Sequence, residues 1–207
     1  MKGIKLNFIN HSNDINNSSI VIFSKNSATD FDELPIAWKV IENCGIGEHH
    51  PLTYDLNVYV SAGDSYGNYT TELLAQYGQQ FEMIKNTSGD VLQLSGQPAM
   101  SSTEIEIANN LPTGSISGNV YRSGSLYAST HNIAPSQKAV FSFKPTIWIG
   151  VVSQITEGEV INSAIMSQIN TEISLLGISS ADIVMTGGGP GPSSTSFTFN
   201  LQNVQMA

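Results

Sequence analysis

The adjacent histidines His49 and His50, which follow Glu48, are the side chains of this chain best suited to chemistry. Imidazole nitrogens and a carboxylate are zinc ligands, so candidate ligands stand side by side. Neighbouring residues of an extended chain point to opposite sides, however, and the helical zinc motif needs its two histidines four positions apart. The remaining candidates lie in separate segments: His11, Cys44 and His131. We therefore expect a solvated loop here and keep a metal-dependent enzyme around His49 and His50 as the second alternative.

The segment GDSYGN at residues 63–68 is the next candidate. Asp64 and Asn68 offer oxygens to a cation such as calcium, but the alternating acidic pattern of a calcium loop is missing. We expect Asp64 to close a turn with its own backbone, with Gly67 at a positive φ. Tyr66 and Tyr69 combine a rigid ring with a hydroxyl group, which suits contact with sugars or proteins. We predict that Asp64, Tyr66, Asn68 and Tyr69 form a ligand or partner contact.

Three other patterns carry no catalytic signature. Gly187–Pro192, read GGGPGP, lacks the lysine of a phosphate-binding loop, so we interpret it as a connector. No G-x-S-x-G motif occurs, and nothing around Cys44 resembles a nucleophile site. Glu104 and Glu106 alternate with isoleucines, which indicates the solvent side of a strand. We predict no enzymatic activity, no catalytic residue, no bound metal and no cofactor.

The composition of the 207-residue chain excludes one class of partner. Only 12% of the residues are charged, against about 25% in ordinary globular proteins, so Ser, Asn, Thr and Gln must supply the polar surface. The formal net charge is −9, with only eight Lys and Arg. Binding of nucleic acid needs clustered basic residues, so we expect no nucleic-acid partner.

The chain shows no targeting segment. It has one cysteine, so no internal disulfide forms, and its N-terminal residues lack the apolar stretch of a signal peptide. No run is long and apolar enough for a transmembrane helix. We expect a cytoplasmic location by default, and export by a route without an N-terminal signal stays open.

The run AVFSFKPTIWIGVV at residues 139–152 is the most apolar stretch, and we expect the fold to form around it. Its β-branched and aromatic residues predict two strands, or one strand interrupted at Pro145, with Trp148 in the core. Strict alternation predicts a strand over 53–62, and helical spacing indicates one or two turns over 71–77. Residues 159–170 fit either helix or strand.

These patterns predict an all-β protein. Short strands separated by turns are typical of an antiparallel β-sandwich, immunoglobulin-like or jelly-roll-like, with at most one or two short helices. We expect a single domain over 1–207, with a division into β subdomains 1–100 and 101–207 as the alternative. The pattern is similar to that of β-rich bacterial proteins, which implies no particular function.

Low charge, a hydrogen-bonding surface and few lysines at strand edges favour self-association. Our leading hypothesis is a structural, self-assembling protein, a subunit of a homo-oligomer, filament, sheath or inclusion. The first alternative is a lectin-like or pore-forming module that binds carbohydrate or lipid head groups through its tyrosine-rich loops.

Overall fold

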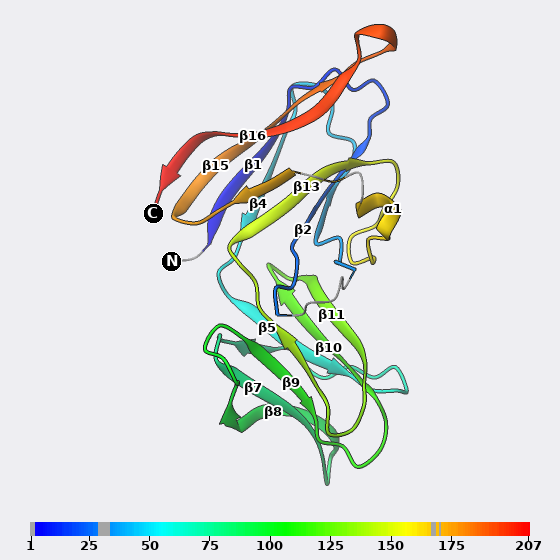
Figure 1. Cartoon of the computed structure of the whole chain (residues 1–207), viewed down its shortest axis with the longest axis vertical. Coiled ribbons are helices and arrows are strands. Elements are labelled where there is room, and N and C mark those ends of the chain that lie inside the picture. Colours follow the sequence, from blue (N-terminus) through cyan, green and yellow to red (C-terminus); the bar gives the residue numbers. More distant parts are fainter. Residues whose placement is uncertain (1–2, 29–33, 167–168, 170) are drawn as a thin grey trace. The chain divides into compact units, whose positions relative to one another are not determined.

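The computed structural model describes residues 3–28, 34–166, 169 and 171–207 (Figure 1). The chain divides into two compact units, each described by itself below. Unit 1 contains the described residues of Met1–Lys25, Leu34–Leu56 and Pro145–Ala207, and unit 2 those of Asn26–Glu33 and Asn57–Lys144. Unit 2 is thus inserted into unit 1, which is a different division from one near residue 100.

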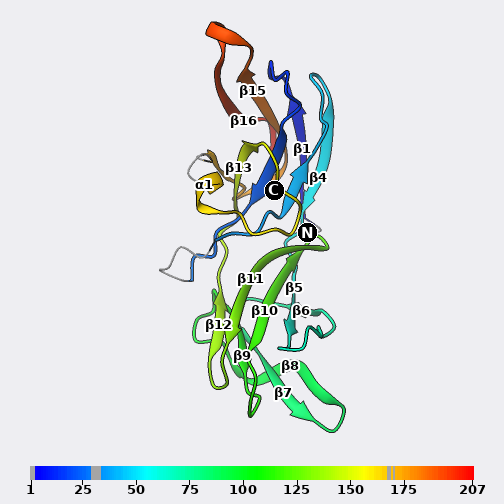
Figure 2. The same ribbon diagram turned by 90° about the vertical axis from the view of Figure 1, so that its right-hand side faces the viewer.

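Unit 1 contains two four-stranded sheets. The first has the order β16-β15-β1-β4 (Figure 1). The second has the order β14-β13-β2-β3. The strands of the first are β1 (Ile4–Asn10), β4 (His49–Tyr54), β15 (Ile178–Gly188) and β16 (Thr195–Met206). Those of the second are β2 (Ser19–Phe23), β3 (Lys39–Ile41), β13 (Thr146–Val152) and β14 (Thr171–Ser174). The short helix α1 (Ser163–Met166) and the 3₁₀ turn η1 (Gly191–Ser193) complete the unit, and Figure 2 shows η1 at the tip of the β15–β16 hairpin.

Unit 2 also contains two four-stranded sheets, with the orders β11-β10-β5-β6 and β12-β9-β7-β8. The strands of the first are β5 (Val58–Gly63), β6 (Leu73–Ala75), β10 (Ile116–Arg122) and β11 (Ser125–Ile133). Those of the second are β7 (Gln79–Asn86), β8 (Gly89–Pro98), β9 (Ile105–Asn109) and β12 (Lys138–Phe141). The predicted all-β, sandwich-like fold is confirmed, and among the described residues helix is limited to α1 and η1.

Two strand pairs are parallel: β1 with β15, and β7 with β9. All other pairs of neighbouring strands are antiparallel in the described part of the chain. Parallel pairing needs a crossover connection, and β1 and β15 lie near opposite ends of the sequence. No short sequence pattern predicts a parallel pair of this kind.

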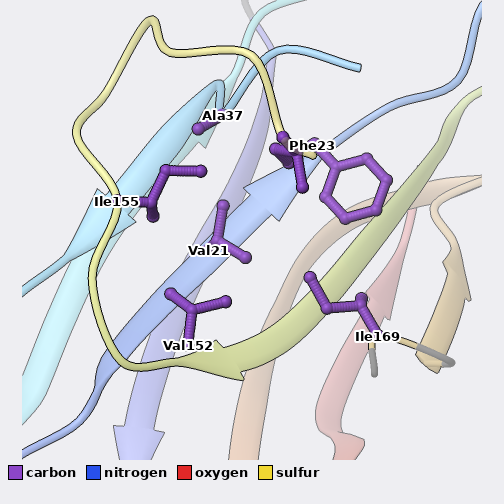
Figure 3. Packing of buried hydrophobic residues seen from close by; sticks show 7 residues of the cluster. Val21, Phe23, Ala37, Val152, Ile155 and Ile169 are labelled. Atoms are coloured by element: carbon purple, nitrogen blue, oxygen red, sulfur yellow. The ribbon is translucent and has the colours of Figure 1, made fainter. Parts of the chain in front are cut away.

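The core of unit 1 joins its second sheet to the segments that follow β13 and precede β3. Val21 and Phe23 of β2 belong to one buried cluster with Val152, the last residue of β13, and Figure 3 shows Val21 beside Val152. The remaining buried members of this cluster are Ala37, Ile155, Ile161 and Ile169. The two sheets of the unit are also in contact. Trp38, just before β3, is fully buried, and its ring packs edge-to-face on Tyr54 of β4 with 5.7 Å between the ring centroids.

The core of unit 2 forms in the same way. Tyr127 of β11 meets Phe143, which follows β12, at 4.8 Å between ring centroids. Gly118 of β10 faces the other sheet so closely that a Cβ atom there would lie 3.2 Å from Ile107 of β9. Each sandwich is therefore held by apolar contacts between its own two sheets.

The central run divides at Pro145, as the sequence predicts, but its halves serve different units. Residues before Pro145 contribute β12 to unit 2, and those after it contribute β13 to unit 1. The expected burial of Trp148 is confirmed in part: the residue packs against the core of unit 1, but it is not fully buried, and its ring lies 3.8 Å from Nζ of Lys25. Trp38 is the buried indole.

Two further predictions of elements are corrected. The predicted strand over 53–62 is two strands, β4 and β5, because the chain passes from unit 1 to unit 2 between Leu56 and Asn57. The helical turns expected over 71–77 are replaced by β6, because Leu73 and Ala75 pair with β5. Of the ambiguous segment 159–170, Ser163–Met166 is helical, and 167, 168 and 170 lie outside the described residues. No helix in the described ranges has the length and apolar character needed to cross a membrane.

Candidate functional site

The predicted contact residues lie on the turn that follows β5. The carboxylate of Asp64 accepts hydrogen bonds from the backbone N–H groups of Tyr66 and Asn68, both at 2.9 Å. Its other oxygen accepts a bond from the Asn68 side chain at 2.8 Å. Gly67 has a φ of 87°. Asp64 therefore organises its own turn, with the positive-φ glycine that the sequence indicates.

These hydrogen bonds also set the charge state of the turn. The bonds from the side chain and backbone of Asn68 hold the pKa of Asp64 below its ordinary value. The carboxylate stays ionised over the whole neutral range, but its oxygens are directed at the turn. Tyr66, in contrast, is 90% exposed and available for contact.

Asp64 and Tyr66 line a hollow of about 350 Å³ on unit 2. Lys85 and Asp90, which pair across the β7–β8 hairpin, lie on its wall with residues 111–115. The volume falls in the range of small-ligand sites, about 300–1,000 Å³. Asn68 and Tyr69 do not line it, so the structure brings two of the four predicted residues to one cavity.

Tyr69 lies at the end of this turn and does not line the hollow. It forms an isolated bridge with Gly63, and its side chain is 69% exposed. A Cβ atom at Gly63 would lie 2.9 Å from the Tyr69 ring and 2.6 Å from Oγ of Ser117. Glycine is thus required where the ring crosses the end of β5.

The adjacent histidines occupy β4, not a loop, and both are exposed. Nδ1 of His49 lies 3.2 Å from Nδ2 of Asn7, while β1 pairs His50 with Phe8. Groups of three or more His, Cys, Asp or Glu side chains that could hold a metal ion are not found among the described residues. As successive residues of a strand, the two imidazoles point to opposite faces.

The sequence gives no sign of a polar ladder that His49 joins. Nδ2 of Asn7 donates to Asp182 at 3.0 Å, and Nδ2 of Asn203 donates to the other oxygen of Asp182 at 2.7 Å. The residues His49, Asn7, Asp182 and Asn203 come from β4, β1, β15 and β16, so the ladder crosses the whole sheet. The bonds from Asn203 and then Asn7 hold the pKa of Asp182 below its ordinary value.

Glu106 corrects the prediction of a solvent-exposed strand side. It is fully buried, and its carboxylate accepts bonds from Lys138 and from Gln80, both at 2.7 Å. Ser95 of β8 continues the row by donating to Gln80 at 3.2 Å. Burial would raise the pKa of Glu106, but the bonds from Lys138, Met100 and Gln80 outweigh it and lower the pKa. This second ladder crosses all four strands of its sheet.

The remaining candidates are Cys44 and the glycine-rich segment at residues 187–192. Burial and, second, the charge of Glu48 raise the pKa of the Cys44 thiol, which disfavours a reactive thiolate. Gly187 and Gly188 end β15 at positive φ angles, and a Cβ atom at Gly188 would lie 2.5 Å from the Phe197 ring. The glycine-rich segment is thus the tip of the β15–β16 hairpin.

Strand β16 is the longest of the strands that lie at sheet edges, with 12 residues. It contains no Asp, Glu, Lys, Arg, His or Pro. Within the described residues, only β15 pairs with it, so its outer backbone edge is open. The edge strand next in length, β8 with 10 residues, contains Asp90 and Pro98, which discourage pairing.

A groove of about 450 Å³ lies beside this edge. Ser196, Phe197 and Phe199 of β16 form one wall, and residues 149–153, at the end of β13, form the other. β14 pairs with Thr146–Ile149 of β13, so in the described part of the chain Gly150–Val152 pair only with β2. Among the described residues, the strand edges on both walls of the groove therefore have no pairing partner, and no charged side chain lines the groove.

These features define an all-β protein built from two sandwich-like units, one of which has a long, uncharged, open strand edge. Comparison of the chain with models of protein families, with curated proteins and with solved structures finds no match.

Proposed function

We propose that this protein is a structural, self-associating subunit that forms homo-oligomers or larger assemblies through its strand edges. The observation that carries the proposal is the open edge of β16, whose 12 residues include no charge and no proline. An edge without charge or proline presents unpaired backbone N–H and C=O groups to any other strand.

Charge supports the same function. At a net charge of −9, two copies repel each other wherever acidic side chains meet. β16 offers a contact without that repulsion, and only 12% of all residues are charged, which limits the repulsion between other surfaces. The two polar ladders centred on Asp182 and Glu106 hold the sheets in register, as a rigid building block requires.

Light scattering on a sizing column, followed by negative-stain microscopy, tests the proposal. We expect multimers at micromolar concentration, and a shift to monomer for Asn200→Lys, which adds a charge on the exposed side of β16. The control Ser88→Lys adds the same charge at the exposed β7–β8 turn and should leave the size unchanged. A wild-type protein that remains monomeric at every concentration would contradict the function.

A second candidate function is carbohydrate binding at the hollow lined by Asp64 and Tyr66. The observation that favours it is the position of the highly exposed Tyr66 at the rim of a polar cavity with Lys85 and Asp90. An aromatic face with neighbouring hydrogen-bonding groups suits a sugar ring.

A glycan array with the labelled protein tests this second function. Tyr66→Ala should abolish retention, whereas Tyr69→Ala should have a smaller effect, because Tyr69 does not line the hollow. The absence of retention on a broad array, or equal loss in both variants, would exclude this site.

A further inference from the structure

We infer that two copies of this chain pair antiparallel along β16 about a two-fold axis at Asn200, joining two four-stranded sheets into one of eight strands. The inference rests on the proposed self-association and names its interface and partner. Four observations carry it: the regular part of β16, its face pattern, the groove beside it and the distribution of charge.

The regular part of β16 fixes the centre of the pairing. From Thr198 to Gln202 the strand pairs with Thr186 to Asp182 of β15 without any shift in register. Register shifts occur on both sides of this segment, and Asn203 has a φ of 50°. Bulges of this kind twist an edge away from a new partner, so a flat strand can add only between Thr198 and Gln202. The middle residue of that segment is Asn200.

The face pattern of the strand is self-complementary about Asn200. Thr198, Asn200 and Gln202 are exposed, whereas Phe199 is buried and Leu201 is half-buried. A two-fold axis at Asn200 places Thr198 opposite Gln202 of the second copy and Phe199 opposite Leu201 of the second copy. Polar residues then meet polar residues on one face, and apolar residues meet apolar residues on the other, as a half-buried sheet requires.

The groove explains where the inward side chains of the added strand go. A strand that continues the sheet beyond β16 projects its inward side chains toward the end of β13, where the groove of about 450 Å³ lies. In this register Leu201 of the second copy lies opposite Phe199 and therefore beside the groove. Phe197, Phe199 and Val152 give the groove an apolar part, next to the hydroxyl groups of Ser18, Ser153, Thr171 and Ser196. The added strand thus gains apolar contacts besides backbone hydrogen bonds.

Charge identifies a second copy as the occupant. A basic peptide would find no carboxylate along the groove or along β16, because neither contains an acidic residue. An uncharged strand of alternating character fits, and β16 is itself such a strand. This contact is isologous and closes on a dimer, so larger assemblies use further contacts built from dimers.

Cysteine cross-linking in a Cys44→Ser background tests the pairing. Directly opposite residues of an antiparallel pair have Cα atoms about 4.5–5.5 Å apart, within the range that a disulfide spans. Asn200→Cys should form disulfide-linked dimers under mild oxidation at least about tenfold faster than Ser88→Cys, since pre-association raises the effective thiol concentration. Thr198→Cys and Gln202→Cys should each cross-link poorly alone and efficiently when mixed.

Each contrary result overturns the inference. If Asn200→Cys links no faster than Ser88→Cys, β16 is not paired about Asn200. If Thr198→Cys or Gln202→Cys links as well alone as in the mixture, the register is wrong. Light scattering on the same samples separates the two proposals. If multimers form but no cross-links appear, self-association occurs through another surface and only the β16 pairing is excluded. If the protein is monomeric, both the self-association and the β16 pairing are excluded.

Discussion

Nζ of Lys138 lies 2.7 Å from Oε1 of Glu106, and the two residues are diagonal neighbours on β12 and β9, whose register pairs Glu106 with Val140. The carboxylate is fully buried, whereas the lysine keeps 29% of its side chain exposed. A buried charge that loses its partner is costly, because its remaining hydrogen bonds do not replace the lost countercharge. The pair is therefore a sensitive point in unit 2.

We expect Lys138→Met to lower the free energy of unfolding by about 2–3 kcal/mol, because it strips Glu106 of its countercharge. Adding Glu106→Gln to this variant should restore part of the loss, since the buried group is then neutral. The matched control is Lys39→Ala, which breaks the more exposed Lys39–Glu157 pair and should cost less than about 1 kcal/mol. Urea denaturation measures all three, and equal losses for Lys138→Met and Lys39→Ala would contradict the assigned role of Glu106.

Stability should fall in acid, and Glu106 should account for part of the fall. The pKa of Glu106 in the folded protein is below its ordinary value of 4.5. As the pH falls below 4.5, the unfolded state therefore takes up a proton at this residue before the folded state does. The stability that ionised Glu106 contributes above pH 4.5 is lost as the pH drops through the pKa of the folded state. Melting curves from about pH 7 to about pH 3 should show a shallower loss in Glu106→Gln than in the wild type. Identical slopes would exclude this source.

The burial of Glu106 also shows why part of the structure could not be predicted from the sequence. Alternation with Ile105 and Ile107 correctly indicates a strand, but it assigns Glu106 to the solvent-exposed face of the sheet. Its partners Gln80 and Lys138 lie 26 and 32 positions away, and only the sheet order brings them together. The ladder through Asn7 and Asp182 could not be predicted for the same reason, because these residues are 175 positions apart.

Features that depend on short stretches of sequence were predicted correctly more often than contacts between distant residues. The β7–β8 hairpin around Ser88, the break at Pro145 and the turn built on Asp64 all follow from short patterns of polar, apolar and turn residues. The hollow beside Tyr66 does not, because residues 111–115 reach it from another part of the chain. The insertion of unit 2 into unit 1 is not predicted from the sequence either, because the alternating pattern of β4 continues into β5 across the boundary between the units.

The two tryptophans should differ in fluorescence. Trp38 is fully buried against Tyr54, whereas Trp148 is half-buried with the ammonium group of Lys25 over its ring. The variant Trp38→Phe, which keeps only Trp148, should emit at longer wavelength and be quenched more strongly by acrylamide than Trp148→Phe. Lys25→Ala should change the emission of the first variant and leave that of the second unaltered. The reverse order of quenching would contradict the placement of the indoles.

Gly150 is required at the end of β13 because Ile169 packs directly against it. A Cβ atom at Gly150 would lie 2.6 Å from Cγ1 of Ile169, which is itself buried in the core of unit 1. We expect Gly150→Ala to destabilise the protein by about 1–3 kcal/mol through overpacking. Gly96 provides the matched control, because it also lies in a strand but has open space where a Cβ atom would be, so Gly96→Ala should be neutral or slightly stabilising.

A double-mutant cycle identifies the cause of the effect at Gly150. Ile169→Ala by itself should cost about 2–5 kcal/mol, because it leaves a cavity in the core. In the double variant the alanine at 150 occupies part of that cavity, so the combined loss should be smaller than the sum of the two single losses. Urea denaturation of the four proteins measures the coupling. Strictly additive losses would show that the cost of a side chain at 150 arises elsewhere, for instance at the facing residue Val21 of β2.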